Sequence, residues 1–239
     1  MMKIYQKLSI ILCLSTLWIQ PTLASISVGS SRIIFPSAEN SQSVEINNRS
    51  PNQPYLINVG ISESLSTKSS DGPFIATPAL FRIEPGASNK VRILKKPNAL
   101  PRDRESIFYF SVLAIPASKS GKVNDNNDLG GSLQVATGNT IKLFYRPNDL
   151  SMTQQEAMGK LQFFRQGNNV RVSNPTPYFI SLNQLVIDGK KIKLDVVKGT
   201  SMVAPFATNV YPVIVGTGTA TWKAINDYGG EETFHATVN

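Results

Sequence analysis

The sequence predicts an all-β protein built from two sandwich domains. After residue 24 the chain shows almost no helical periodicity, and short β-rich runs recur with Gly, Pro, Asn and Ser between them. The pattern breaks once, just after Pro147, and then starts again. Since 239 residues suffice for two small domains, we expect domains at residues 25–147 and 148–239.

Residues 1–24 resemble a cleaved export signal. Lys3 and Lys7 form a positive start, Leu8 to Ile19 is mostly apolar, and Thr22-Leu23-Ala24 is a small-residue cleavage site. The apolar run is short for a membrane span, although a membrane anchor is the alternative. Cleavage would remove Cys13, the only cysteine, so the mature chain would fold without a disulfide. It would also remove the apolar run, so we expect the mature chain not to insert into a membrane.

The first domain contains seven expected strands, the number and length of an immunoglobulin-like domain. They span residues 26–35, 43–48, 55–61, 74–83, 90–94, 106–115 and 133–147. The sixth is apolar on both faces, which predicts a fully buried central strand. Residues 117–130, between the sixth and seventh, are polar and rich in Gly and Asn, and they form too long a connection for a tight hairpin turn.

The seventh segment, Leu133 to Pro147, is unusually long for a strand and is predicted to lie at a sheet edge. Its odd-numbered apolar residues share one face: Leu133, Val135, Ile141, Leu143 and Tyr145. Periodicity alone leaves open that these are ordinary core residues. An exposed apolar edge invites aggregation, so a protein that keeps one is expected to pair it with another chain.

The second half shows a weaker version of the same pattern. Residues 148–156 are polar and form the expected linker, with a possible helix start at Ser151 to Gln154. Strands are expected at residues 161–166, 170–174, 178–187, 191–197, 219–226 and 232–238. Gly167-Asn168 and Asp188-Gly189 are turn signals between neighbouring runs. This half is long enough for a second, smaller sandwich.

Motifs for catalysis are almost absent. His235 is the only histidine and lies in an expected terminal strand, where a surface or packing role is commoner than that of a ligand or base. With no cysteine after residue 24, a zinc site or a Cys–His dyad is not expected. There is no G-x-S-x-G elbow or phosphate-binding glycine loop. We therefore expect no enzyme, metal or cofactor, with a periplasmic hydrolase or sugar-binding enzyme as one alternative. The net charge of +8 suits a solvated surface or an acidic partner, and export argues against nucleic acid.

Seven short strings, in order along the chain, resemble the PapD-like periplasmic pilus chaperones of the chaperone–usher family. They lie at residues 30–36, 77–86, 100–108, 114–116, 141–147, 174–178 and 225–229, and IKLFYRP at 141–147 is the strongest match. The resemblance implies two immunoglobulin-like domains at an angle with a cleft between them. Residues 117–130 are longer than in the short-loop subclass, but the chain lacks the cysteine pair of the long-loop subclass, so we assign it to the short-loop group.

The resemblance implies a function without catalysis or ATP. Such a chaperone lends its seventh strand to a fimbrial subunit that lacks its last strand, and later passes the subunit to an outer-membrane usher. The matching donor positions here are Leu133, Val135, Thr137 and Ile141. Thr137 and Gly138 depart from the family's bulky or regular strand residues, which predicts a shallower grip there.

The remaining implied sites are charged. Arg32 and Lys142 match two cations that bind the subunit's C-terminal carboxylate, whereas Glu105, Arg146 and Asp227 match a network that joins the domains. The alternative to both is unrelated surface charge. A structural pilin or adhesin of the same system is the competing function, although pilins usually carry a disulfide and a single domain. The free protein could also cap its edge by self-association.

Overall fold

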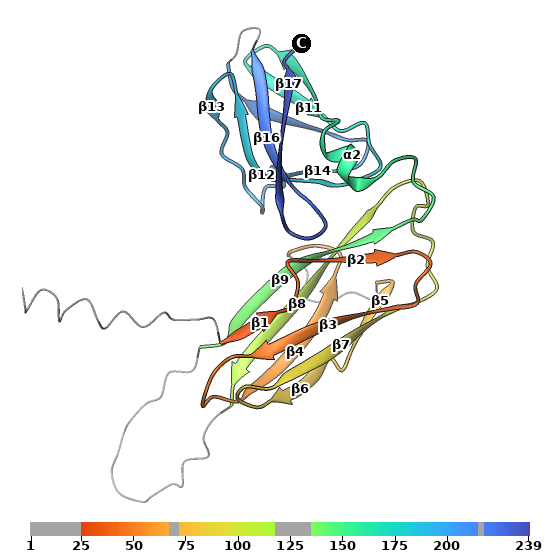
Figure 1. Ribbon diagram of the computed structural model, residues 1–239, viewed down its shortest axis with the longest axis vertical. Coiled ribbons are helices and arrows are strands. Elements are labelled where there is room, and N and C mark those ends of the chain that lie inside the picture. Colours follow the sequence, from red (N-terminus) through yellow and green to blue (C-terminus); the bar gives the residue numbers. More distant parts are fainter. Residues whose placement is uncertain (1–24, 67–71, 118–134, 215–217) are drawn as a thin grey trace, which may run out of the picture.

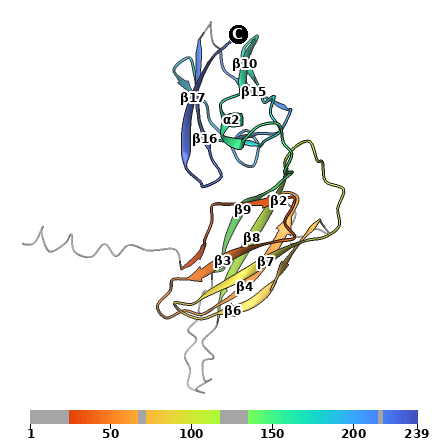
Figure 2. The same cartoon turned by 45° about the vertical axis from the view of Figure 1, so that its right-hand side comes forward.

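The computed structural model describes residues 25–66, 72–117, 135–214 and 218–239. The expected export signal, Leu133 and nearly all of the 117–130 connection lie outside these residues. The described chain forms two sandwiches placed end to end at an angle (Figure 1), and Figure 2 shows the same arrangement after a turn of 45°. Among the described residues, no helix combines the length and the apolar character that a membrane crossing needs.

The first domain packs two sheets around one core. One sheet has the strand order β1-β3-β7-β5 and the other has the order β2-β9-β8-β4-β6. The strands are β1 (Ile26–Val28), β2 (Arg32–Pro36), β3 (Ser41–Asn48), β4 (Tyr55–Ser62), β5 (Phe74–Thr77), β6 (Leu80–Ile83), β7 (Ser88–Lys95), β8 (Ser106–Pro116) and β9 (Thr137–Arg146). Phe35, Phe110 and Leu143 are fully buried between the sheets.

Two expected strands of this domain are each divided between the sheets. The first run becomes β1 and β2, which lie in different sheets, and the 74–83 run becomes β5 and β6 around a cis bond between Thr77 and Pro78. The expectation that residues 106–115 are buried on both faces is wrong, because β8 alternates and its Leu113 is 42% exposed. It is nevertheless central, lying between β9 and β4.

Strand β9 is a sheet edge over only part of its length. It pairs with β8 from Thr137 to Tyr145, and β2 pairs with it in parallel from Lys142 to Arg146. No described strand pairs with residues 137–141 on the side away from β8. We call residues 137–141 the open edge. The expected strand start at Leu133 is not seen, since Val135 and Ala136 precede the first strand residue.

The second domain has its own core beneath a short helix. It comprises α2 (Gln154–Met158), β10 (Gln162–Gln166), β11 (Asn169–Ser173), β12 (Ile180–Ile187), β13 (Lys190–Lys191), β14 (Met202–Val203), β15 (Thr208–Pro212), β16 (Thr219–Ile225) and β17 (Glu231–Thr237). One sheet is β10-β11-β15; the other is β13-β12-β16-β17, with β14 also on β12. Buried Trp222 donates to the Met158 carbonyl at 3.0 Å, which ties the helix to the core.

Local signals explain the helix and one hairpin. Thr153 caps α2 through a reciprocal pair of hydrogen bonds with Glu156, the arrangement of a capping box. Asp188 and Gly189 both have positive φ, as a two-residue hairpin turn requires. The strand expected at 191–197 is wrong beyond Lys191, and β14 and β15 were not expected. The division at residue 147 stays a prediction.

Candidate functional site

Two cations lie next to each other where the domains meet. Arg32 begins β2 and is the direct partner of Lys142 in the parallel β2–β9 pair. Paired residues of neighbouring strands project from the same face about 5 Å apart, so the two side chains emerge together. The open edge of β9 ends at this point, because β2 occupies the next position beside the strand.

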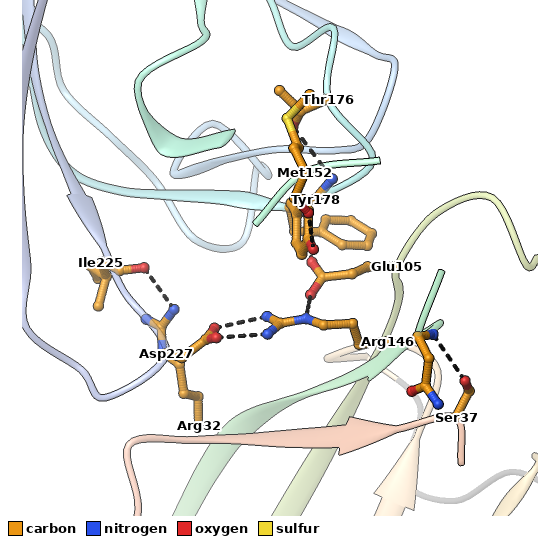
Figure 3. A network of polar contacts seen from close by, with 11 residues as sticks. Arg32, Ser37, Glu105, Arg146, Met152, Thr176, Tyr178, Ile225 and Asp227 are labelled. Carbon is orange, nitrogen blue, oxygen red and sulfur yellow. Dashed lines mark hydrogen bonds and ion pairs between the residues drawn. The ribbon is translucent and has the colours of Figure 1, made fainter. Parts of the chain in front are cut away.

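The Arg32 guanidinium is partly buried and only partly satisfied. Its Nη1 donates to the carbonyl oxygen of Ile225 at 2.9 Å (Figure 3), whereas its buried Nε has no hydrogen-bond partner among the described residues. The guanidinium also lies 5.9 Å from the Phe144 ring centroid. Burial lowers the pKa of Arg32 from its usual value, although arginine stays charged at any physiological pH.

Lys142 shares this environment. Its Nζ donates to the Ser181 hydroxyl of β12 at 3.1 Å. Burial, together with the positive charge of Arg32, lowers the pKa of Lys142 to about 8. Within the described part of the chain, neither cation forms an ion pair with a carboxylate. Two partly buried positive charges without a direct ion-pair partner among the described residues favour binding of an anion.

Arg146 links the two domains through hydrogen bonds from two edges of its guanidinium group. Its Nε donates to Glu105 Oε1 at 2.8 Å, and its two terminal nitrogens donate to the Asp227 carboxylate at 2.6 and 2.8 Å (Figure 3). Glu105 is 3% exposed, and its other oxygen accepts from the Phe179 amide of the second domain at 2.9 Å. The structure thus brings together the three residues that the sequence singled out for this network.

The ionisation of the network is set by burial and by its own charges. Burial raises the pKa of Glu105, and the opposing charge of Arg146 offsets this only in part. Burial alone would lower the pKa of Arg146, but the hydrogen bonds and charges of Asp227 and Glu105 raise it. Arg146 is therefore held as a cation between two carboxylates.

Several interdomain contacts were not predicted from the sequence, although Arg104, Phe144 and Gly229 lie within the matched strings. The ring of Phe144 lies 5.9 Å from that of Phe179, and the Arg104 guanidinium lies 4.9 Å from the Phe206 ring. Gly229, in the turn between β16 and β17, has φ +85°, and a Cβ there would come within 2.5 Å of the Ser31 hydroxyl. Such contacts join residues far apart in the chain, so no local pattern marks them.

A pocket of about 770 Å³ lies between the domains on the linker side. Arg146 lines it from the first domain, and Tyr178 and Asp227 line it from the second, with residues 150–156 along its wall. Arg32 and Lys142 do not line this pocket. The expected cation pair and this interdomain pocket are therefore separate features.

The described residues that are expected to enter a partner's groove differ in exposure. Val135 is 62% exposed and Thr137 is also exposed, whereas Leu133 lies outside the described residues. Ile141 is only 8% exposed and packs in the core of the first domain. The expectation for Ile141 is thus corrected, because a side chain buried in its own domain cannot fill a partner's groove.

The core of the first domain is open near this edge. Thr137 and Asn139 line a pocket of about 230 Å³ together with Tyr55 and Val112. Since Thr137 has the same parity as buried Ile141, its side chain lies on the core side of the sheet. The apolar face of β9 therefore passes from the core into solvent without changing sides.

The described residues contain no group of three or more His, Cys, Asp or Glu side chains arranged to hold a metal ion. His235 lies on β17, where its Nδ1 is 3.0 Å from the Thr221 hydroxyl of the neighbouring strand. This is an exposed cross-strand contact.

Comparison with known proteins covers both domains. Residues 25–151 match the N-terminal domain model of the PapD pili and flagellar-assembly chaperones, and residues 156–236 match the C-terminal domain model of the PapD pili-assembly chaperones. The probable fimbrial chaperone protein ElfD of Escherichia coli K12 is 36% identical over 225 residues, which cover 93% of this chain and 90% of ElfD. The chaperone protein FimC of the same strain is 33% identical over 86% of this chain and 81% of FimC.

Solved structures of chaperones also resemble this chain. The Escherichia coli chaperone DraB superposes with a TM-score of 0.74 at 32% identity, covering 90% of this chain and 97% of DraB. A structure of the Salmonella enterica SafA pilin in complex with the SafB chaperone gives a TM-score of 0.75 at 27% identity, over 92% of this chain and 99% of the matched one. The chain belongs to the family of PapD-like pilus-assembly chaperones.

Proposed function

We propose that this chain is a periplasmic chaperone that binds, folds and caps fimbrial subunits by donor-strand complementation and delivers them to an outer-membrane usher. One observation carries the proposal: the open edge of β9 leads directly to the paired cations Arg32 and Lys142. The names of the relatives support a chaperone, and the SafB–SafA complex shows a related chaperone with a pilin.

The open edge supplies the affinity. Backbone groups of residues 137–141 that point away from β8 have no strand partner, so an added strand can form hydrogen bonds along them. Val135 and Thr137 then present alternate side chains to the groove of the subunit, continued by Leu133. Burial of the exposed apolar side chain of Val135 would stabilise the complex.

The cations fix where the added strand ends. Because β2 already pairs with β9 from Lys142 onward, a strand added to the open edge has to stop where β2 begins. At that point Arg32 and Lys142 offer charge-assisted hydrogen bonds to a terminal carboxylate. A strand whose C-terminus lies at Lys142 runs parallel to β9, in line with β2. The end point sets the register along the whole edge.

The interdomain network has a positioning role in this proposal. Arg146 lies on the same strand as the open edge and holds the second domain through Asp227. A buried charge network fixes geometry more than it adds stability. It would therefore keep Ile225 and Ser181 beside the cations and set the angle at which a subunit is received.

The finer parts of the proposal follow from the same mode of binding. Strand addition makes and breaks no covalent bond, so no catalysis, cofactor or ATP is proposed. Export by the first 24 residues would place the chain in the periplasm, and the short-loop assignment stays a prediction. In the absence of a subunit, a second copy of the chain could cover the open edge.

Capture of subunits tests the function. Tagged chain is co-expressed in periplasm with each fimbrial subunit of its organism, and complexes are purified and weighed by native mass spectrometry. We expect one-to-one complexes and subunits that aggregate when the chain is left out. Failure to recover any subunit would contradict the proposal. So would finding the chain in finished fibres, because a structural subunit is present there and a chaperone is not.

A further inference from the structure

A glycine lies within the open edge without a reason inside the free chain. Glycine in a strand weakens it and usually marks a bulge, a left-handed backbone or a close approach. At Gly138 the β8–β9 register runs without a shift from Thr137 to Tyr145, which excludes a bulge. Gly138 is also absent from the described glycines with positive φ.

Space inside the domain does not require glycine either. A Cβ built at Gly138 would have its nearest neighbours, the Leu113 Cδ1 atom and the Val112 carbonyl oxygen, at 3.9 Å, which is ordinary van der Waals contact. A larger residue with strand propensity would therefore fit in the free protein. The free chain therefore imposes no steric requirement for glycine at this position, whereas a bound partner strand can.

The surroundings of Gly138 indicate the kind of partner group. Gly138 has the same parity as Lys142, so both lie on the outer face of the sheet. Its direct neighbour on β8 is Leu113, which is 42% exposed on that face. Gly138 and the exposed Leu113 thus present bare backbone and an aliphatic side chain side by side on the outer face, and we call this pair the notch.

A strand added to the edge would place one residue directly over this notch. Paired residues of neighbouring strands project to the same face, so the residue opposite Gly138 faces outward as well. Strands are about 4.8 Å apart, and a flat ring can lie across a glycine and reach the next strand, an arrangement known to rescue glycines in sheets. A short or polar side chain would leave both Gly138 and Leu113 uncovered.

We propose that Gly138 and Leu113 form an acceptor for an aromatic side chain of the subunit strand, and that this notch selects among subunits. The inference rests on the proposed function. A strand that ends at Lys142 and runs parallel to β9 places the selected residue about four positions before its C-terminus. Offset packing of a ring on an aliphatic side chain then buries the exposed face of Leu113.

The test compares subunits that differ at one residue. A captured subunit is prepared with Phe, Leu or Ser at the position that pairs with Gly138. Each form is co-expressed with the chain and with the same competitor subunit, and the amount of each subunit recovered with the chain is measured. We expect the wild-type chain to recover the Phe form at least tenfold more than the Ser form. Gly138→Val should remove this preference while its thermal melt stays at or above the wild-type value.

Matched variants separate the inference from the function on which it rests. Thr140→Val lies on the same face of the same edge without filling the notch, so it should keep the preference, and Leu113→Ser should weaken it. If Lys142→Ala weakens capture but Gly138→Val keeps the Phe preference, the notch proposal fails alone. If amide hydrogen exchange in the complex shows no protection of residues 137–141, the donor-strand function fails as well.

Discussion

Replacing both Arg32 and Lys142 by alanine should abolish subunit capture while leaving the fold intact. Each side chain makes only one hydrogen bond to the second domain, to Ile225 and to Ser181, and no ion pair in the described chain. A hydrogen bond to a charged group contributes roughly 1.5–3 kcal/mol, so each single variant should bind about 10- to 100-fold more weakly. Lys90→Ala, which removes an exposed cation from β7, is the control for lost charge.

The measurement is the affinity for a purified subunit together with the thermal melt of each variant. The account expects the double variant to lose capture, the control to keep it, and the melts to remain near wild type. Undiminished capture by the double variant would remove the anchor role. A collapsed melt would instead assign the two cations to the interdomain contact.

A pH series tests the same anchor without a large structural change. Because the pKa of Lys142 is lowered to about 8, its charge is lost as pH rises through that value. Capture should therefore be flat from pH 6 to pH 7.5 and weaken above pH 8, by at most about tenfold per pH unit. The Lys142→Arg variant keeps its charge and should show no such fall. An equal fall in both proteins would contradict the anchor.

The stability of the free chain should change in the opposite sense. An unfolded lysine titrates near 10.5, so between about pH 8 and that value the unfolded state binds more protons than the folded one. The contribution of Lys142 to stability therefore rises with pH across this window. Weakened capture above pH 8 cannot then be attributed to unfolding through Lys142.

The second large effect is expected from Arg146→Ala. It would leave Glu105 buried at 3% exposure without its charged partner and would release Asp227. Breaking a buried pair from one side costs about 3–5 kcal/mol, which corresponds to a fall in melting temperature of roughly 6–20 °C. Small-angle X-ray scattering should also show a wider range of interdomain angles. Both changes should appear in the free protein.

Glu105→Gln is the matched comparison, since it removes one charge and leaves the Arg146–Asp227 pair in place. Its loss of stability should be clearly smaller than that of Arg146→Ala. Unchanged melting and scattering for Arg146→Ala would show that the network does not hold the domains. Equal losses in the two variants would assign the effect to Glu105 alone.

The sequence pattern predicts what depends on alternation and on turns. Alternation placed Leu143 and Tyr145 on one face of the strand, and the structure shows that this face belongs to the core there. Asp188-Gly189 formed the expected turn because its positive φ values suit these residues. The cation pair and the network came from resemblance to family motifs, since their members lie on different strands. Periodicity could not show that β2 covers half of β9, because strand neighbours are set by tertiary packing.

The predictions that were wrong failed for the same reason, because burial and strand neighbours depend on tertiary packing. Ile141 shares the alternating pattern of the donor residues, and only the position of the core shows that it is buried. Residues 191–197 alternate like a strand, yet after Lys191 the chain turns, with the Asp195 side chain accepting from the Lys198 amide. Ser181 and Phe179 carry no motif, and their role depends on how the second domain lies against β9.

Amide hydrogen exchange on the purified one-to-one complex tests the central claim most directly. In the free chain, amides of residues 137–141 that point away from β8 should exchange rapidly, whereas residues 142–146 are already protected by β2 and β8. The account predicts strong slowing of exchange at residues 137–141 when a subunit binds, with little change at residues 142–146. A stable one-to-one complex in which residues 137–141 exchange as fast as in the free chain would contradict strand addition at this edge.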